Sequence, residues 1–314
     1  MLNDGETKEK KRIAPNIDTL VLSSGGMAAM LAHVHVLSRM QSSEIIRLEN
    51  INRVVGVSAG SIVGSLIAIG GNWCDMISKI ESIARPHSSF PSASGTRLFS
   101  MYGLIDVQQY ASERLAPIIA KRFNITTSAA ESITMASLHV RTNVTLQIIA
   151  TSLNTAGPIV FDHITTPQTP LLEAILASCA VPLICVPRTI RINGTDHMCV
   201  DGAMCDPCPT GYNQSGVILS EPISQESTIV LRVVHERMNI STVEGSNIVT
   251  YLKRLYVLVR KKMDTFNYNG LVLQTTVPLV SPTSTLDCAT IADILTSVEK
   301  SVRDFSAAFV IEEQ

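Results

Sequence analysis

The sequence is poor in aromatic residues and in charge of either sign. Aromatic side chains make up 4% of the 314 residues and charged side chains 17%, and the net charge is −2. Nucleic-acid surfaces combine stacking aromatics with clustered basic residues, so this composition argues against a nucleic-acid partner. Hydrophobic residues reach 46%, which is enough for a sizeable core and excludes a disordered chain.

The chain also lacks a paired set of cysteines and an apolar leader. Its seven cysteines are odd in number and scattered, which predicts free thiols in a reducing compartment. The first 16 residues are polar and contain no apolar stretch of the kind found in signal peptides. We therefore expect an intracellular, cytoplasmic protein.

One uncharged stretch, Val54–Cys74, is long enough to span a bilayer. Gly56, Gly60 and Gly64 give it the spacing of closely packed membrane helices. Two further glycines and several serines lower its hydropathy, and neither end carries the aromatic and basic anchors of a membrane span. A buried strand and helix, packed closely on a sheet, are the favoured interpretation.

Predicted strands and helices alternate along the chain. Strands are expected at 17–22, 54–55, 140–152, 158–161, 188–192, 197–200, 227–235 and 271–277, and helices at 27–40, 73–84, 104–123 (interrupted at Pro117), 171–180, 246–264 and 289–311. Residues 85–97 are expected to form a surface loop. The alternation predicts an α/β fold, a three-layer α/β/α sandwich with a mainly parallel central sheet. We expect a polar tail over 1–16 and a single domain over 17–314.

The segment Gly56-Val57-Ser58-Ala59-Gly60 lies between a predicted strand and a predicted helix. This G-x-S-x-G pattern is typical of a sharp strand-to-helix turn that lifts one serine out of the sheet. Small residues on both sides allow the chain to bend so tightly. The serine hydroxyl then lies near a helix N-terminus, where unpaired N–H groups favour developing negative charge.

Two other turns carry chemistry. Ser24-Gly25-Gly26 follows the first predicted strand, and its backbone N–H groups can hold an anion. Because the serine turn follows one strand–helix unit later, both turns are expected at the same edge of the sheet. Asp201-Gly202-Ala203 ends a later predicted strand.

In this order and spacing, the three motifs resemble the patatin-like phospholipase family. Further segments agree with the family pattern, namely Tyr102–Asp106, Ile149–Gly157, Ala177–Pro182, and Asp206 with Pro209. The similarity covers residues 17–210. The family is known for lipid acyl hydrolysis by a serine–aspartate dyad that needs no histidine, metal or organic cofactor.

The resemblance implies that Ser58 is the nucleophile and Asp201 its base. It also implies that an oxyanion is bound by backbone N–H groups of Gly25, Gly26 and Ala59. Gly56 and Gly60 would shape the serine turn, and Gly202 and Ala203 the aspartate loop. The expected substrate is an ester of a phospholipid or a neutral lipid, met at a membrane or another lipid surface.

The glycine turn departs from the family pattern. Where the family reads G-G-G-x-R/K-G, this chain has Ser24, Ala28 and Ala29 at the first glycine, the basic residue and the last glycine. Two hypotheses therefore stand: a lipid acyl hydrolase, or a catalytically weak or silent scaffold that binds lipid or a protein partner. Restoring the basic residue as Ala28→Arg is expected to raise activity with little change in stability, since position 28 lies in the first turn of a helix.

Other candidate groups have simpler interpretations. His197, Cys199, Cys205 and Cys208 invite a zinc site, but no second C-x-x-C pair exists and ordinary thiols are favoured. His33, His35 and His163 are expected to pack or to lie at the surface, and not to form a triad with Ser58. A basic stripe over residues 253–262 suits a lipid-facing helix, although a helix on the sheet with solvated lysines and arginines is the favoured interpretation.

Overall fold

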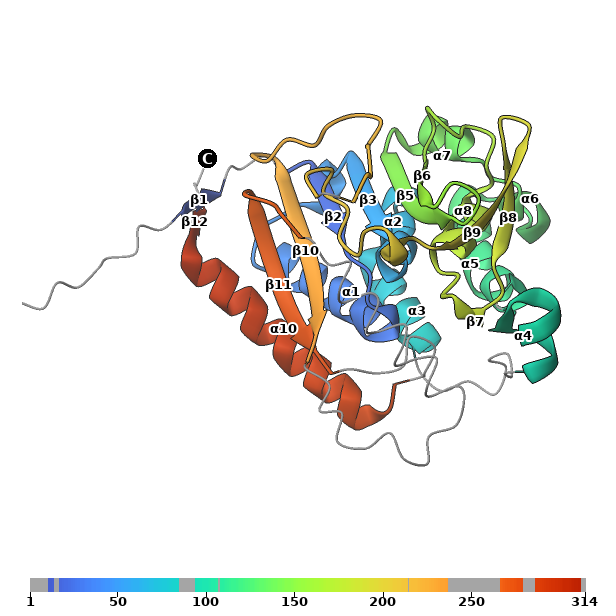
Figure 1. Cartoon of the computed structure of the whole chain (residues 1–314). Coiled ribbons are helices and arrows are strands. Elements are labelled where there is room, and N and C mark those ends of the chain that lie inside the picture. Colours follow the sequence, from blue (N-terminus) through green and yellow to red (C-terminus); the bar gives the residue numbers. More distant parts are fainter. Residues whose placement is uncertain are drawn as a thin grey trace, which may run out of the picture.

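The centre of the fold is an eight-stranded sheet that is mostly parallel (Figure 1). A computed structural model describes residues 11–13, 17–84, 94–106, 108–213, 215–236, 266–278 and 286–311. The parallel strands are β11 (Leu271–Val277), β10 (Thr228–His235), β2 (Thr19–Leu22), β3 (Arg53–Val57) and β5 (Thr145–Ser152), in that spatial order. Antiparallel strands β9 (Thr195–Asp201), β8 (Arg188–Ile192) and β6 (Gly157–Phe161) complete the sheet beside β5.

Helices lie on both sides of the sheet: described α-helices pack on one face, and a 3₁₀ helix with an irregular segment covers the other. The helices are α1 (Gly26–Ser42), α2 (Ala59–Ile69), α3 (Trp73–Ala84), α4 (Gly95–Met101), α5 (Gln108–Phe123), α6 (Thr127–Glu131), α7 (Met135–Thr142), α8 (Leu171–Ser178) and α10 (Cys288–Ala308). The second face is covered by the 3₁₀ helix η2 (Gly202–Met204) and the residues that follow it, as far as Ile223. The expected α/β class with a mainly parallel sheet is confirmed.

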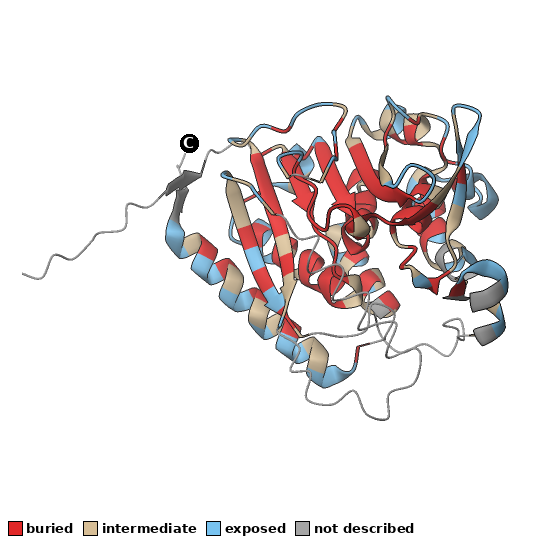
Figure 2. Ribbon diagram, in the orientation of Figure 1, coloured by how far each residue is buried: buried red, intermediate tan, exposed pale blue. Residues whose placement is uncertain are grey.

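Successive side chains of the central strands point alternately to the two faces of the sheet and pack against different layers. Leu20 and Leu22 of β2 pack with α1 and α2, while Val21 between them packs with the residues that follow η2. Because both faces are buried, these strands read as continuous apolar runs. Figure 2 shows the central strands buried along most of their length, while α10 is buried along one side only.

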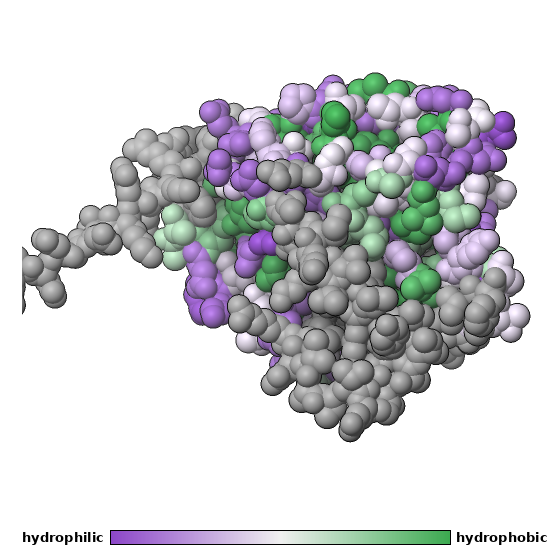
Figure 3. Space-filling model, viewed as in Figure 1, coloured by the Kyte–Doolittle hydropathy of each residue, from purple (hydrophilic) through white to green (hydrophobic). Residues whose placement is uncertain are grey.

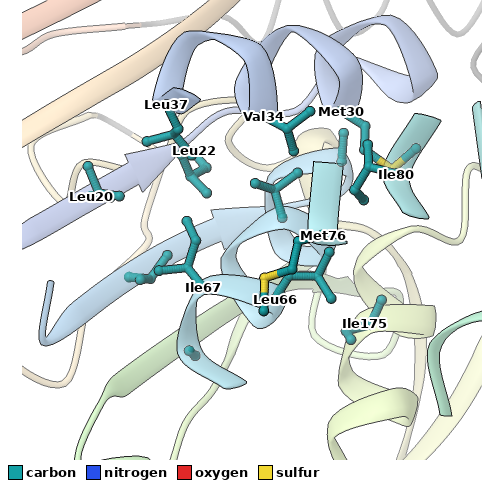
Figure 4. Close-up of a cluster of buried hydrophobic side chains, with 14 of the residues drawn as sticks. Leu20, Leu22, Met30, Val34, Leu37, Leu66, Ile67, Met76, Ile80 and Ile175 are labelled. Carbon is teal, nitrogen blue, oxygen red and sulfur yellow. The ribbon is translucent and has the colours of Figure 1, made fainter. Parts of the chain in front are cut away.

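The largest cluster lies between the sheet and the helices. Figure 4 shows Leu22 of β2 beside Leu37 of α1, and Leu66 of α2 beside Met76 of α3. Gly64 lets α2 lie close to the sheet, since a Cβ there would be 2.9 Å from a methyl group of Val54. Within the described part of the chain, no helix is both long and apolar enough to cross a membrane.

Several predicted boundaries were wrong. The strand expected at 140–152 begins at Thr145, because residues 140–142 close α7, a helix started by a Thr134–Ser137 capping box. Helix α5 continues through Pro117 without the expected interruption. Residues 95–97 of the expected loop over 85–97 belong to α4, and residues 85–93 lie outside the described residues. The helix expected at 246–264, with its basic stripe, also lies outside them.

Short strands lie outside the main sheet. The helix expected to reach residue 311 ends at Ala308, and the last three of its expected residues form β12 (Phe309–Ile311). Strand β12 pairs with β1 (Lys11–Ile13), so part of the segment expected to be a polar tail forms a strand. A second pair joins β4 (Gly103–Ile105) to β7 (Leu183–Cys185). The main sheet combines strands from residue 19 to residue 277, and the single domain expected over 17–314 stays a prediction.

A buried polar network closes the amino-terminal ends of β3 and β5. The Arg53 guanidinium donates to Gln147 Oε1 at 2.7 Å and to the carbonyl oxygens of Glu221 and Pro222. Gln147 in turn donates to Asp162 Oδ2 at 3.3 Å. Burial raises the pKa of Asp162, but hydrogen bonds from Thr165 and other donors outweigh it and hold that pKa below its ordinary value.

We expect Asp162→Asn to lower the free energy of unfolding by about 2–3 kcal/mol at pH 7, because buried donors lose a charged acceptor. A depressed pKa in the folded state stabilises the fold above the unfolded-state pKa, and that contribution disappears as the pH falls through the folded-state pKa. Urea titrations at several pH values should therefore show a gap between wild type and variant that is full above pH ~5 and narrows below pH ~4. A gap that does not change with pH would contradict the assignment.

Candidate active site

Ser58 and Asp201 meet at the carboxyl edge of the parallel strands. Ser58 joins β3 to α2, and Asp201 ends β9. The Ser58 hydroxyl donates to Asp201 Oδ2 over 2.7 Å. Ser58 is 7% exposed and Asp201 fully buried, so the pair lies in surroundings from which most water is removed.

The strained turn at Ser58 depends on the two glycines of its motif. Ser58 has φ 53° and ψ −120°, a conformation that residues with side chains rarely adopt. A Cβ on Gly56 would lie 2.5 Å from the carbonyl oxygen of Gly60, and a Cβ on Gly60 would lie 2.1 Å from that of Leu22. Both positions therefore exclude any side chain, and α2 can begin directly against the end of β2.

Asp201 is oriented by the backbone around it. Its Oδ1 accepts a hydrogen bond from the Ala203 N–H at 2.8 Å, which leaves Oδ2 directed to Ser58. Its own N–H donates to the carbonyl of Ala180 at 2.8 Å. Gly202 passes so close to β5 that a Cβ would lie 2.1 Å from the Ile149 carbonyl oxygen. The aspartate loop is thus fixed against β5 on one side and against the end of α8 on the other.

Ser178 holds the backbone of Ser58, a role that the sequence analysis did not identify. The Ser58 N–H donates to Ser178 Oγ at 2.8 Å, and Ser178 Oγ donates to the Ile149 carbonyl at 2.6 Å. This relay occupies the Ser58 N–H, while the role expected for the N–H of the next residue, Ala59, stays a prediction. The only signal for Ser178 was its place in the Ala177–Pro182 segment.

Two thiols lie near the pair and stay protonated. Cys179 Sγ is 3.7 Å from Ser61 Oγ, which itself donates to the Ser58 carbonyl at 2.6 Å. Burial raises the pKa of Cys179 far above its ordinary range, and the charge of Asp201 raises it further. Burial likewise raises the pKa of Cys185 to about 12. The surroundings of Ser58 therefore carry the charge of Asp201 without competing thiolates.

The glycine turn lies beside the serine turn, at the same edge of the sheet. Leu22 pairs with Gly56 in the parallel register of β2 and β3, so both strands end together. Gly25 and Gly26 have φ values of 146° and 66°, which only glycine adopts readily. Their N–H groups and that of Ala59 belong to helix starts, where no partner exists within the helix.

The altered positions of the glycine turn are buried. The methyl group of Ala29 lies 2.5 Å from the place a Gly25 Cβ would take. With alanine at position 29, any side chain at position 25 would therefore clash with it. Ala28 has no exposed surface and belongs to the main apolar cluster. The expectation that Ala28→Arg would leave stability nearly unchanged was therefore wrong, because the guanidinium would enter an apolar region.

A histidine that the sequence analysis did not single out also approaches this turn. The Nε2 atom of His235, from the end of β10, lies 3.4 Å from the place a Gly25 Cβ would take. Because β10 precedes β2 in the sheet order, only the sheet topology brings this side chain to the turn. No motif spacing in the sequence could have identified it.

The remaining candidates are engaged elsewhere. His33 Nε2 lies 2.8 Å from the Ser23 carbonyl oxygen, His35 pairs with Glu81 at 3.1 Å, and His163 stacks on His139 with ring centroids 3.7 Å apart. Of the zinc candidates, His197 contacts Ser152, and the cysteines are free thiols. Among the described residues, no three potential ligands come together as a metal site.

Comparisons with known proteins give the family and the fold of this chain. A model of the patatin-like phospholipase family matches residues 20–212. The crystal structure of VipD from Legionella pneumophila superposes with a TM-score of 0.56 and 15% identity, over 99% of this chain and 77% of that chain. ExoU, in its complex with SpcU from Pseudomonas aeruginosa, gives a TM-score of 0.45 and 16% identity, over 94% of this chain but only 52% of that chain. The search of curated proteins found no match.

We expect Gly60→Ala to destabilise the fold by at least about 3 kcal/mol, because the added methyl would overlap a backbone carbonyl that cannot move independently of the sheet. Gly157→Ala is the matched control, since the nearest atoms to its new methyl lie at 3.8 Å. Thermal unfolding of the two variants should show a large loss for position 60 and little change for position 157. Equal melting temperatures would contradict the close approach of α2 to β2.

Proposed function

This chain belongs to the patatin-like phospholipase family, and we propose that it hydrolyses acyl esters of phospholipids or neutral lipids with Ser58 and Asp201 as its catalytic pair. The family is one of lipid hydrolases. The observation that carries the proposal is the 2.7 Å hydrogen bond from the Ser58 hydroxyl to Asp201 Oδ2. A serine hydroxyl is a weak nucleophile unless a base lies within hydrogen-bond reach, and Asp201 supplies one.

In the first step, Ser58 Oγ attacks the ester carbonyl while Asp201 Oδ2 accepts its proton. The tetrahedral oxyanion is bound by the N–H groups of Gly25, Gly26 and Ala59. The intermediate collapses, the C–O bond to the alcohol breaks, and Asp201 returns the proton to the departing alkoxide. The acyl group then remains on Ser58.

In the second step, water attacks the acyl-enzyme while Asp201 accepts one of its protons. Collapse of this intermediate releases the fatty acid, and the proton on Asp201 returns to Ser58 Oγ. No histidine takes part in this scheme, which needs neither a metal nor an organic cofactor. Because Asp201 Oδ1 stays bound to the Ala203 N–H, a single oxygen serves both steps.

The proposal also includes the surface at which the substrate is met and the compartment in which the protein works. A lipid ester is met at a membrane or another lipid surface, so we infer peripheral contact with such a surface. Free thiols at all seven cysteines support a reducing, cytoplasmic location. A catalytically weak or silent scaffold is the second candidate, favoured by the loss of the basic residue at Ala28.

A fluorophosphonate probe should label Ser58, because this reagent reports an activated serine regardless of the natural substrate. Ser58→Ala should abolish labelling and ester hydrolysis with an unchanged melting temperature. Mass spectrometry of the labelled peptide identifies the site. Labelling that persists in the alanine variant would refute the nucleophile, whereas an unlabelled and inactive wild type would favour the scaffold.

Asp201→Asn should lower kcat for a short-chain ester by about 10³-fold or more, because an amide accepts no proton from Ser58. Asp196→Asn is the matched control, as its side chain lies on the same strand and is exposed. Steady-state kinetics of both variants, with circular dichroism to verify folding, provide the measurement. Comparable activity in the two variants would mean that another group is the base.

A further inference from the structure

His33 is a buried histidine that the catalytic scheme does not use. It has no exposed surface, and its Nε2 lies 2.8 Å from the carbonyl oxygen of Ser23. A carbonyl oxygen only accepts hydrogen bonds, so Nε2 must carry the proton and Nδ1 a lone pair. Burial lowers the pKa of His33 to about 4 in spite of this bond. The imidazole is therefore a neutral, oriented donor at pH 7.

Ser23, the acceptor of this bond, lies where several elements meet. Its N–H donates to the Leu231 carbonyl at 3.1 Å, and its hydroxyl accepts from the Val233 N–H at 2.8 Å, so β10 holds it on one side. Its carbonyl oxygen also lies 2.8 Å from the place a Gly60 Cβ would take. The bond to His33 therefore fixes a carbonyl that lies between α1 and the first turn of α2.

Ser24, which connects Ser23 to the glycine turn, is also held by hydrogen bonds. The Ser24 N–H donates to the Pro207 carbonyl at 2.8 Å, and the Ser24 carbonyl accepts from the Ser23 hydroxyl at 3.2 Å. The backbone groups of Ser23 and Ser24 are thus bound, and the N–H groups of Gly25 and Gly26, which follow, find no backbone acceptor among the described residues. Glycine has wide conformational freedom, so the direction of these N–H groups depends on how the preceding peptides are held.

We propose that His33 is a positioning residue for the glycine turn, holding the Ser23 carbonyl so that the Gly25 and Gly26 N–H groups point to the oxyanion. The inference rests on the proposed function, since it assigns the turn to oxyanion binding. His33 touches neither substrate nor reacting atoms in this role. It supports a turn that has Ser24, Ala28 and Ala29 where the family pattern has its first glycine, its basic residue and its last glycine.

A pair of substitutions separates the hydrogen bond from the packing. In His33→Gln, the amide nitrogen can take the place of Nε2 and donate to Ser23, whereas His33→Leu fills similar space without a donor. For a short-chain ester, we expect the leucine variant to lose about ten- to hundredfold in kcat with KM within twofold, since misaligned donors act on the transition state. The glutamine variant should recover most of kcat. If the leucine variant does not fold, His33→Asn replaces it, because its shorter side chain falls short of Ser23.

His35→Leu is the matched control, because His35 lies two residues along α1 and pairs with Glu81. It should keep the wild-type kcat. A leucine variant at position 33 with wild-type kcat, or a glutamine variant equally impaired, would overturn the inference.

Hydrogen–deuterium exchange of a peptide covering residues 23–30 adds a readout that needs no activity. Exchange should be faster in His33→Leu than in His33→Gln or wild type, because the released carbonyl frees the turn. Equal exchange in the three proteins would overturn the inference. If wild type shows neither turnover nor probe labelling, the proposed function fails, while this comparison still decides whether His33 holds the turn.

Discussion

The close approach between the start of α2 and the end of β2 is the constraint on which the site depends. Gly60 allows it, because any side chain there would overlap the Leu22 carbonyl. This approach brings the glycine turn beside the serine turn and places the Ser23 carbonyl against the first turn of α2. The left-handed backbone of Ser58 then directs its hydroxyl to the strand that carries Asp201. Backbone packing thus determines the geometry of the pair before any side chain contributes.

The sequence supported the fold class and the three turns because their signals are local. Glycine positions, the apolar runs of doubly buried strands and the order of elements can be read without knowing which segments meet. The Ser58–Asp201 pairing followed from a family resemblance, since nothing in residues 58 and 201 alone indicates contact across 143 positions of the chain. Helix α7 was missed because its residues 140–142 share the β-branched, alternating character of the strand that follows.

Side-chain roles that depend on long-range contact could not be predicted. Ser178 reaches Ser58 across 120 positions of the chain, and His235 reaches the glycine turn from β10, so only the sheet order brings them there. The small effect on stability expected for an arginine at position 28 was wrong because burial there also depends on the tertiary structure. The first turn of a helix is usually accessible to solvent, but the first turn of α1 is buried in the main apolar cluster. Burial at Ala28 and contact between Ala29 and Gly25 show that the altered motif is packed as part of the fold. The residues that replace the family pattern have become core residues.

The two faces of the sheet are covered in different ways, and this difference concerns the Ser58–Asp201 pair. The second layer follows Asp201 directly, and its described part contains a loop in which the Asp206 carboxylate accepts hydrogen bonds from Asn213 and Ser215. Asp201 itself is held in the main sheet, because it pairs with Ala150 of β5 and its N–H donates to the Ala180 carbonyl. The residue that accepts the Ser58 hydroxyl is therefore also the point at which the chain passes from the sheet to its second layer, so a ligand bound at Ser58 and Asp201 would stabilise the junction between the two.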